Sequence, residues 1–110
     1  MKLDAWLWVA QRASAAVLGV CVAIHLATNI YAVQGGLSAA EILSRTRGST
    51  LLAAFYGVFV LAVAVHAPIG LRTVAREMLG WRGSHIDVAL ALFALFLVWF
   101  GWRAVGGLVG

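Results

Sequence analysis

Charged side chains are scarce in this chain. Of its 110 residues, only 8 are Lys or Arg and 4 are Asp or Glu, whereas 64% are hydrophobic. A soluble domain carries about a quarter charged residues, and its surface could not be built from this composition. The scarcity of charge therefore excludes a soluble globular domain and predicts a membrane protein.

Cysteine is nearly absent as well. The single cysteine, Cys21, excludes an intramolecular disulfide and a set of thiolates for an iron–sulfur cluster. The G-x-G-x-x-G pattern of dinucleotide-binding folds is also missing. The basic residues form no cluster with interleaved aromatics, so we expect no nucleic-acid partner. Flavin or iron–sulfur chemistry would have to belong to partner chains.

Long apolar runs are abundant instead. They extend over about 13–33, 51–71 and 86–104. A bilayer core of ~30 Å needs roughly 20 apolar residues in a helix, and each run has that length. We therefore predict an all-α membrane protein, with one domain over residues 1–110 and three transmembrane helices that run up, down and up.

Basic residues at the ends of the apolar runs indicate the orientation. Five lie on the side of the N-terminus and three on the other side. Because cytoplasmic loops are enriched in Lys and Arg, this excess predicts a cytoplasmic N-terminus. The five are Lys2, Arg12, Arg72, Arg76 and Arg82, and the three are Arg45, Arg47 and Arg103.

Turn and capping residues predict where the helices begin and end. Residues 1–12 are expected to form an interfacial lead-in, and glycines 35–36 to end the first helix. The S-x-x-E pattern of residues 38–41 is a capping box, so a short interfacial helix is expected at about 38–46. The second helix should start after Ser49 and continue to about Leu79, and Ser84 should cap the third.

A polar stripe lies within the first apolar run. Ser14, Cys21, His25 and Thr28 share one face of a helix at about 100° per residue. Lipid penalises polar groups at this depth, so the stripe is expected to face protein or a cofactor. Two interpretations of His25 stay open here, an interhelical hydrogen bond and a ligand to a bound group.

The second apolar run carries His66 with Gly70 one turn later. A glycine beside a histidine lets a flat macrocycle approach the backbone while the imidazole reaches iron, so this pattern indicates a haem site. Arg72 and Arg76 follow, and their guanidinium groups can pair with haem propionates. Anchoring at the membrane surface explains either arginine equally well. His85, at the start of the third run, is expected to meet water or headgroups.

The two intramembrane histidines are expected at different depths. His25 lies two residues outward of the midpoint of its run, at Ala23, and His66 lies five inward of the midpoint at Leu61. Seven residues amount to roughly 10 Å along a helix. Axial ligands of one iron sit at nearly the same height, so His25 and His66 are predicted to serve different centres.

Three short motifs carry a resemblance to a known family. Residues 66–72 with Glu77 are similar to an H-x-x-x-G-[IL]-R signature followed by an acidic residue. Residues 11–15 resemble H-R-x-S-G, although Gln11 replaces the histidine, and residues 25–29 resemble H-L-x-x-N. Together they resemble the cytochrome b membrane-anchor subunits of succinate dehydrogenase and fumarate reductase, the complex II family.

The resemblance implies a set of site residues. His66 would be an axial ligand of haem b, His25 would serve an outer haem in a two-haem member, and Arg12 would lie near quinone and a propionate. The full expected set is His66, Gly70, Arg72, Arg76, Arg12, Ser14 and His25.

It also implies cofactors and partners. One or two haems b are expected, each shared with a partner chain, with quinone as substrate. A flavoprotein and an iron–sulfur subunit would dock on the cytoplasmic face of a bacterial inner membrane. One histidine per level cannot complete the ligation of an iron, so a second membrane subunit or another copy of this chain is required. The alternatives are a cytochrome b subunit of another membrane oxidoreductase and a cofactor-free scaffold or transporter subunit.

Overall fold

The structure, a computed structural model, describes residues 2–110 and is built from helices alone over that range. Three of the helices are long and apolar enough to cross a membrane, as the three apolar runs predict. The four helices are α1 (Lys2–Gln34), α2 (Ala39–Thr46), α3 (Thr50–Met78) and α4 (Ser84–Val109).

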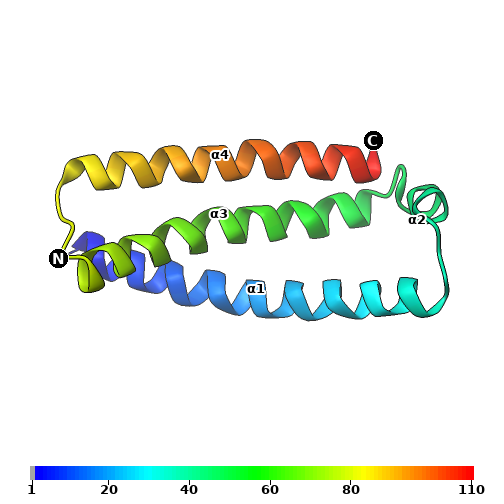
Figure 1. Cartoon of the computed structure of the whole chain (residues 1–110), viewed down its shortest axis with the longest axis horizontal. Coiled ribbons are helices and arrows are strands. Elements are labelled where there is room, and N and C mark those ends of the chain that lie inside the picture. Colours follow the sequence, from blue (N-terminus) through cyan, green and yellow to red (C-terminus); the bar gives the residue numbers. More distant parts are fainter. Residues whose placement is uncertain (1) are drawn as a thin grey trace.

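The three long helices lie side by side along the long axis, with α3 between α1 and α4 (Figure 1). The start of α1 and the α3–α4 connection share one end of the molecule, called the N-terminal end below. The short helix α2 and the C-terminus share the other, called the α2 end (Figure 1). The predicted up-down-up arrangement is therefore confirmed. The longest dimension, 48 Å, exceeds a ~30 Å bilayer core, so both ends reach beyond it.

The connections follow the predicted turn chemistry. Gly36 has φ 65° just after α1, and Gly48 has φ 74° just after α2, a left-handed conformation that suits glycine. The Ser38 side chain accepts a hydrogen bond from the Glu41 amide, and the Glu41 side chain accepts one from the Ser38 amide. Ser49 caps α3 by accepting from the Leu52 amide. The capping box and the Ser49 cap are thus confirmed.

Two boundaries differ from expectation. The lead-in is part of α1, which is already helical from Lys2 and continues without a break into the span. Ser84 is the first residue of α4 rather than its cap, because Gly83, with φ 126°, occupies the cap position without a side-chain hydrogen bond. The polar cap that was predicted is therefore replaced by a glycine turn. Residue 1 lies outside the described residues.

Small side chains set the packing of the layer. A Cβ on Gly101 of α4 would lie 2.4 Å from Val60 Cγ1 of α3, so the missing side chain allows this close approach. Of the predicted polar stripe on α1, Ser14 and Cys21 are buried and His25 is half-buried, whereas Thr28 is exposed. Helix α2 is joined to α4 because the Thr46 hydroxyl donates to Leu108 O at 2.7 Å, and the Gly48 amide just after α2 donates to Val109 O at 2.7 Å.

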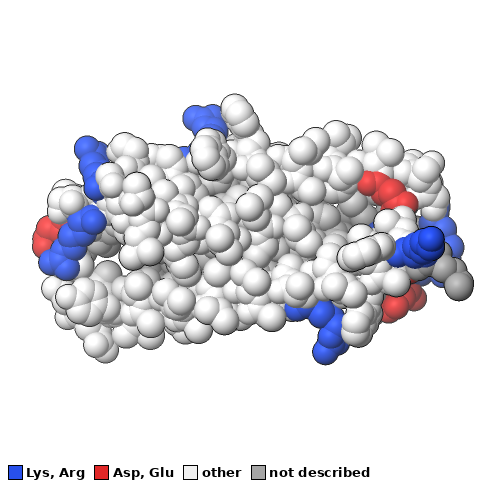
Figure 2. Space-filling view, turned by 180° about the vertical axis from the view of Figure 1, so that it is seen from behind, with Lys and Arg blue, Asp and Glu red and all other residues white. Residues whose placement is uncertain are grey.

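The outer surface of the layer suits a membrane. Large apolar side chains on all three long helices are exposed, among them Val20, Leu61 and Leu92. In Figure 2 most Lys, Arg, Asp and Glu lie toward the two ends of the face, one basic side chain at the upper edge lies farther inward, and the centre of the face is uncharged. This is a multi-pass membrane protein.

Candidate functional site

The first candidate region lies where the N-terminal half of α1 meets α3. Gly70 follows His66 by one turn on α3, and its lack of a side chain makes room for Gln11 of α1. A Cβ on Gly70 would come within 3.3 Å of Gln11 Nε2. The space beside Gly70 is occupied in this structure by the Gln11 carboxamide, and the approach of a macrocycle to Gly70 stays a prediction.

Two buried polar atoms in this region have no hydrogen-bond partner among the described residues. They are Nδ1 of His66 and Oε1 of Gln11. Buried polar atoms are nearly always paired, so each such orphan requires an explanation. The two are complementary, because Nδ1 can carry a proton and a carboxamide oxygen can only accept one. A proton on Nδ1 leaves the lone pair of the imidazole on Nε2.

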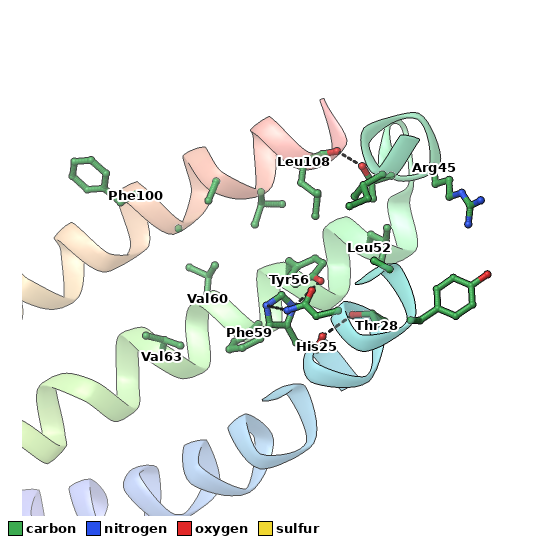
Figure 3. Close-up of a pocket in the computed structure, with 18 of the residues that line it drawn as sticks. His25, Thr28, Arg45, Leu52, Tyr56, Phe59, Val60, Val63, Phe100 and Leu108 are labelled. Atoms are coloured by element: carbon green, nitrogen blue, oxygen red, sulfur yellow. Dashed lines mark hydrogen bonds between the residues drawn. The ribbon is translucent and has the colours of Figure 1, made fainter. Parts of the chain in front are cut away.

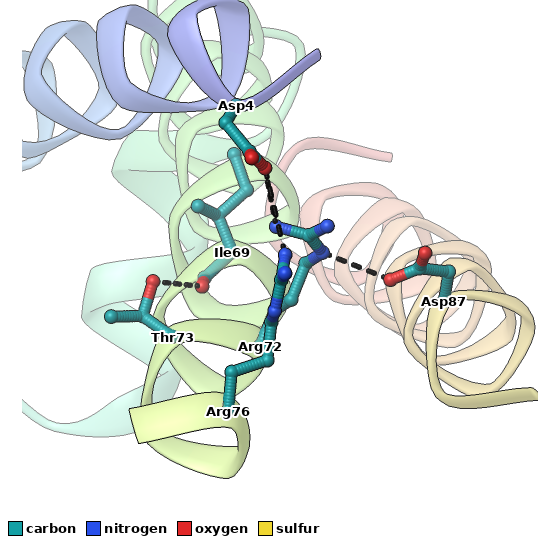
Figure 4. A network of polar contacts seen from close by, with 6 residues as sticks. All are labelled: Asp4, Ile69, Arg72, Thr73, Arg76 and Asp87. Atoms are coloured by element: carbon teal, nitrogen blue, oxygen red, sulfur yellow. Dashed lines mark hydrogen bonds and ion pairs between the residues drawn. The ribbon is translucent and has the colours of Figure 1, made fainter. Parts of the chain in front are cut away.

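Arginines and carboxylates form a network at the N-terminal end, shown in Figure 4. Arg72 Nε lies 2.9 Å from an oxygen of Asp87 on α4. Arg72 and Arg76 also approach one oxygen of Asp4 on α1, at 3.3 and 3.5 Å. Two positive and two negative side chains thus balance, and the network joins all three long helices. The guanidinium groups expected to meet propionates are engaged here by Asp4 and Asp87.

The contacts of Arg12 and Ser14 lie within α1. Arg12 is exposed, and its guanidinium carbon lies 5.1 Å from the centre of the Trp8 ring, a cation–π contact. Ser14 is buried and donates its hydroxyl to the Gln11 carbonyl at 3.1 Å. Ser14 therefore fixes the turn of α1 that carries Gln11, and Arg12 points to the surface.

The second candidate region surrounds His25, nearer the α2 end. His25 Nδ1 lies 3.0 Å from the Tyr56 hydroxyl of α3, and Asn29 Nδ2 lies 3.4 Å from His25 Nε2. The imidazole also meets the rings of Tyr56 and Phe59 edge-on, at centroid distances of 5.6 and 5.8 Å. The interhelical hydrogen bond that the sequence left open for His25 is thus present.

A groove of about 750 Å³ begins at this cluster (Figure 3). All four helices contribute to it, and its lining is mostly aliphatic and aromatic. A smaller pocket of about 450 Å³ lies near Arg72 and Asp87 at the N-terminal end and is lined by apolar side chains of the three long helices.

The two histidines lie at different levels. His25 faces Tyr56 and Phe59, which precede His66 on α3 by ten and seven residues. At ~1.5 Å per residue this is a separation of about 10–15 Å along the helix. Within residues 2–110 no group of three or more His, Cys, Asp or Glu side chains could hold a metal ion together. His85 is exposed at the start of α4.

Sequence reasoning missed Tyr56 and the acidic partners Asp4 and Asp87. The depth argument contained the signal for Tyr56. His25 lies two residues outward of the midpoint of its run. Phe59 lies equally far outward of Leu61, the midpoint of the second run, so it is at the level of His25. The turn of α3 at that level includes Tyr56. The pairing of Asp4 with Arg72 had no such signal, because it depends on α1 being helical from Lys2.

Comparison with known families gives one match, which covers nearly the whole chain. The model of the succinate dehydrogenase/fumarate reductase transmembrane subunit family matches residues 1–102. No curated protein and no solved structure matches the chain.

Proposed function

The chain belongs to the succinate dehydrogenase/fumarate reductase transmembrane subunit family, and we propose that it binds haem b through His66. In this role it anchors the soluble subunits and carries electrons between the iron–sulfur subunit and membrane quinone. The match over residues 1–102 supports the anchor role. The single observation that supports haem binding is the buried, unpartnered Nδ1 of His66.

The surroundings of His66 fit an axial ligand. Imidazole is a common axial ligand of haem iron, and such a histidine donates its other N–H to an acceptor that fixes the tautomer. Gln11 Oε1 is an unused acceptor on the facing helix. His66 as a whole is only half-buried, so part of its side chain is open on a face of the layer, where a second membrane subunit can approach. A bound haem b supplies a one-electron carrier within the membrane.

The arginines have a defined role in this proposal. Arg72 holds Asp87 tightly at 2.9 Å, whereas the contacts of Arg72 and Arg76 with Asp4 are longer, at 3.3 and 3.5 Å. The ion pair of Arg76 with Asp4 is therefore the weaker one, and Arg76 is the better partner for a propionate. Arg72 is the residue that ties α3 to α4, through Asp87.

Partner chains complete the assembly. Each iron needs a second axial ligand that this chain does not place at the level of His66, so a second membrane subunit or another copy supplies it. The flavoprotein and iron–sulfur subunits would dock at the N-terminal end, on the cytoplasmic side of a bacterial inner membrane. Arg12, exposed at that end, remains the candidate for the quinone site there.

The assignment of His25 to a second haem receives less support from its contacts. Nδ1 meets Tyr56 and Nε2 meets Asn29, so both nitrogens already have hydrogen-bonding neighbours. A ligand role would require Asn29 to move away from Nε2. We therefore propose a single haem, on His66, and keep a second haem on His25 as the alternative that the experiment below separates.

A reduced-minus-oxidised spectrum of the purified complex, with its partner subunits, tests the proposal. We expect a b-type haem that is lost in His66→Ala and retained in His85→Ala, a matched control on an exposed histidine. Loss of one haem of two in His25→Ala would establish the two-haem alternative. A complex without b-type haem, or a His66→Ala variant with an unchanged spectrum, would overturn the ligand assignment and favour a cofactor-free anchor.

A further inference from the structure

The outer edge of α4 carries one charged side chain among apolar and aromatic ones. Gly101 of α4 faces α3, because a Cβ there would touch Val60. Arg103 follows Gly101 by two residues, so at about 100° per residue it lies on the opposite side of α4, away from the other helices of this chain. Arg103 is exposed, and within residues 2–110 it forms no ion pair.

Arg103 lies deep within the membrane-spanning part of the layer. Helices α3 and α4 run in opposite directions and meet at Val60 and Gly101, so Arg103 is level with residue 58 of α3. Residue 58 is three residues from Leu61, the midpoint of the second apolar run, which is about 4.5 Å along the helix. A ~30 Å core extends about 15 Å to either side of its midplane, so Arg103 lies about 10 Å inside the boundary of the core.

An arginine at this depth requires a negatively charged partner. Charged side chains inside a membrane are costly, and almost all of them face the interior of a bundle or pair with another group. Side chains of a helix lean toward its N-terminus, and for α4 this direction leads toward the midplane. The guanidinium of Arg103 is therefore directed away from the headgroups at the α2 end, and a carboxylate within the membrane is a better placed partner than a lipid phosphate.

The acidic residues of this chain do not reach the level of Arg103. They are four, Asp4, Glu41, Glu77 and Asp87. Three lie at the N-terminal end of the layer, and Glu41 lies on α2 at the other end. A second copy in the same membrane, parallel or antiparallel, would present these acids at the two membrane surfaces again. The partner of Arg103 therefore belongs to a different chain.

The side chains around Arg103 are typical of a protein interface. Trp99 and Trp102 of α4 are 60% and 69% exposed. Tryptophans of membrane proteins gather at the boundaries with water, but these two lie near the midplane, at the level of Arg103. Trp and Arg are the residues that most often dominate the binding energy of protein interfaces. Gly106 and Gly107, one turn further along α4, are exposed, and their missing side chains let a second helix approach closely.

We propose that the outer face of α4, made of Leu95, Trp99, Arg103 and Gly106, binds a transmembrane helix of another chain that carries an Asp or Glu level with Arg103. The carboxylate and the guanidinium form two parallel hydrogen bonds in apolar surroundings. The inference deepens the proposed function and rests on it, since it gives the chemistry of a second membrane subunit in the complex. This contact is at the edge of the layer and is separate from the haem site expected at His66.

Photocrosslinking in the purified complex tests this surface. Trp99 is replaced by p-benzoyl-phenylalanine, and the complex with its partner subunits is irradiated in phosphatidylcholine nanodiscs. Crosslinked peptides are then identified by mass spectrometry. We expect a crosslink to a membrane-spanning peptide of another subunit, with an Asp or Glu within about one helical turn of the crosslinked residue.

Charge variants of Arg103 identify the interaction. Arg103→Gln leaves the partner carboxylate unpaired, so the crosslinked fraction should fall about tenfold, whereas Arg103→Lys keeps the positive charge and should retain most of it. Arg47→Gln, on an exposed arginine at the same end of the molecule, is the matched control and should leave the crosslink unchanged. Arg103→Asp should abolish the crosslink, and replacement of the identified acid by Arg should restore it.

Several outcomes would overturn the inference. A crosslink to phospholipid alone would show that Arg103 pairs with a headgroup phosphate, and a crosslink to a second copy of this chain would exclude a different partner. An unchanged crosslink in Arg103→Gln, or a crosslinked segment without an acidic residue, would exclude the ion pair. If the complex does not assemble with the crosslinker at Trp99, Leu95 on the same face takes its place.

The reduced-minus-oxidised spectrum of the same samples separates this inference from the proposed function. A complex without b-type haem that still forms the Arg103-dependent crosslink would refute the haem proposal and leave the docking surface standing. A complex with haem on His66 and no such crosslink would refute the docking surface alone.

Discussion

Gln11 and His66 each carry a buried polar atom without a partner among the described residues, and Gln11 of α1 reaches α3 at Gly70, one turn from His66. A hydrogen bond from His66 Nδ1–H to Gln11 Oε1 would satisfy both atoms and make the imidazole a stronger electron donor to iron. A better donor stabilises the oxidised iron and lowers its reduction potential. Gln11, which replaces the histidine of the family's H-R-x-S-G motif, thus has a role as the acceptor for His66 Nδ1–H.

Replacing Gln11 by Leu should therefore raise the midpoint potential of the haem. A hydrogen bond contributes about 1 kcal/mol, which corresponds to about 40 mV for one electron. Gln11→Glu, with a stronger acceptor, should shift the potential the opposite way. A spectroelectrochemical titration of the purified complex measures both. Gln34→Leu, on an exposed glutamine of the same helix, is the control, and equal potentials for all three variants would refute the pairing.

Asp87 is the partner on which Arg72 depends most. The Arg72 side chain is 17% exposed and lies 2.9 Å from Asp87, whose side chain is 50% exposed. Asp87→Asn keeps an oxygen that can accept from Arg72 Nε but removes its negative charge, so the longer Asp4 contact is the one ion pair left to a mostly buried guanidinium, and we expect a loss of about 1 kcal/mol. The thermal midpoint of the complex should fall, and the difference from wild type should shrink at high salt. Glu77→Gln, an exposed acid of α3 at the same end, should change neither quantity.

At the scale of helices, the close contact of α3 with α4 rests on a single glycine. A Cβ on Gly101 would lie 2.4 and 2.8 Å from the two γ-carbons of Val60, and neither helix can yield without separating. Gly101→Ala should therefore destabilise the protein by about 1–3 kcal/mol, the usual cost of overpacking. Unfolding of the purified protein in sodium dodecyl sulfate measures this change.

The double variant Gly101→Ala with Val60→Ala identifies the cause. Shortening Val60 removes the two closest contacts and leaves only its Cβ, at 3.1 Å, so the double variant should be more stable than Gly101→Ala alone. Gly106→Ala is the matched control, because a Cβ there meets nothing within 4 Å. A Gly101→Ala variant as stable as Gly106→Ala would show that the helices separate freely at this point.

Element boundaries were predictable where a side chain dictates the turn. The capping box of Ser38 and Glu41 and the Ser49 cap are local patterns, and the structure confirms them. Ser84 is not the cap, because Gly83 occupies the N-cap position of α4. The conformation of Gly83 depends on how the α3–α4 connection closes. The depths of His25 and His66 followed from helix geometry alone. Contacts between helices, such as Arg72 with Asp4, depend on helix rotation, which hydropathy does not specify.

At the scale of the whole molecule, the layered arrangement limits what one chain can bind. Helix α3 lies between α1 and α4, and the intramembrane histidines are about 10–15 Å apart along the helix axis. The chain expressed alone should therefore show no b-type spectrum, and co-expression with its partner subunits should restore it. Immunoblotting of both membranes must show equal amounts of the chain. If the chain expressed alone retains haem and sediments as a dimer, the second axial ligand of the iron comes from another copy of the chain.

The orientation of the layer in the membrane is predicted from charge, and it can be measured with cysteines at the two ends. Ser44 lies on α2, and Ser84 lies at the start of α4, at the opposite end; both are exposed. The wild-type Cys21 is 4% exposed, so it should not react and serves as the internal blank. With five basic residues on the N-terminal side and three on the other, the N-terminal end should face the cytoplasm.

A membrane-impermeant maleimide added to intact spheroplasts should then label Ser44→Cys. It should label Ser84→Cys only after solubilisation in detergent, where reaction of both variants proves that both thiols are accessible. The reverse pattern would place the α2 end, and with it the groove beside Tyr56, on the cytoplasmic side, and the iron–sulfur subunit could not then dock beside Arg72.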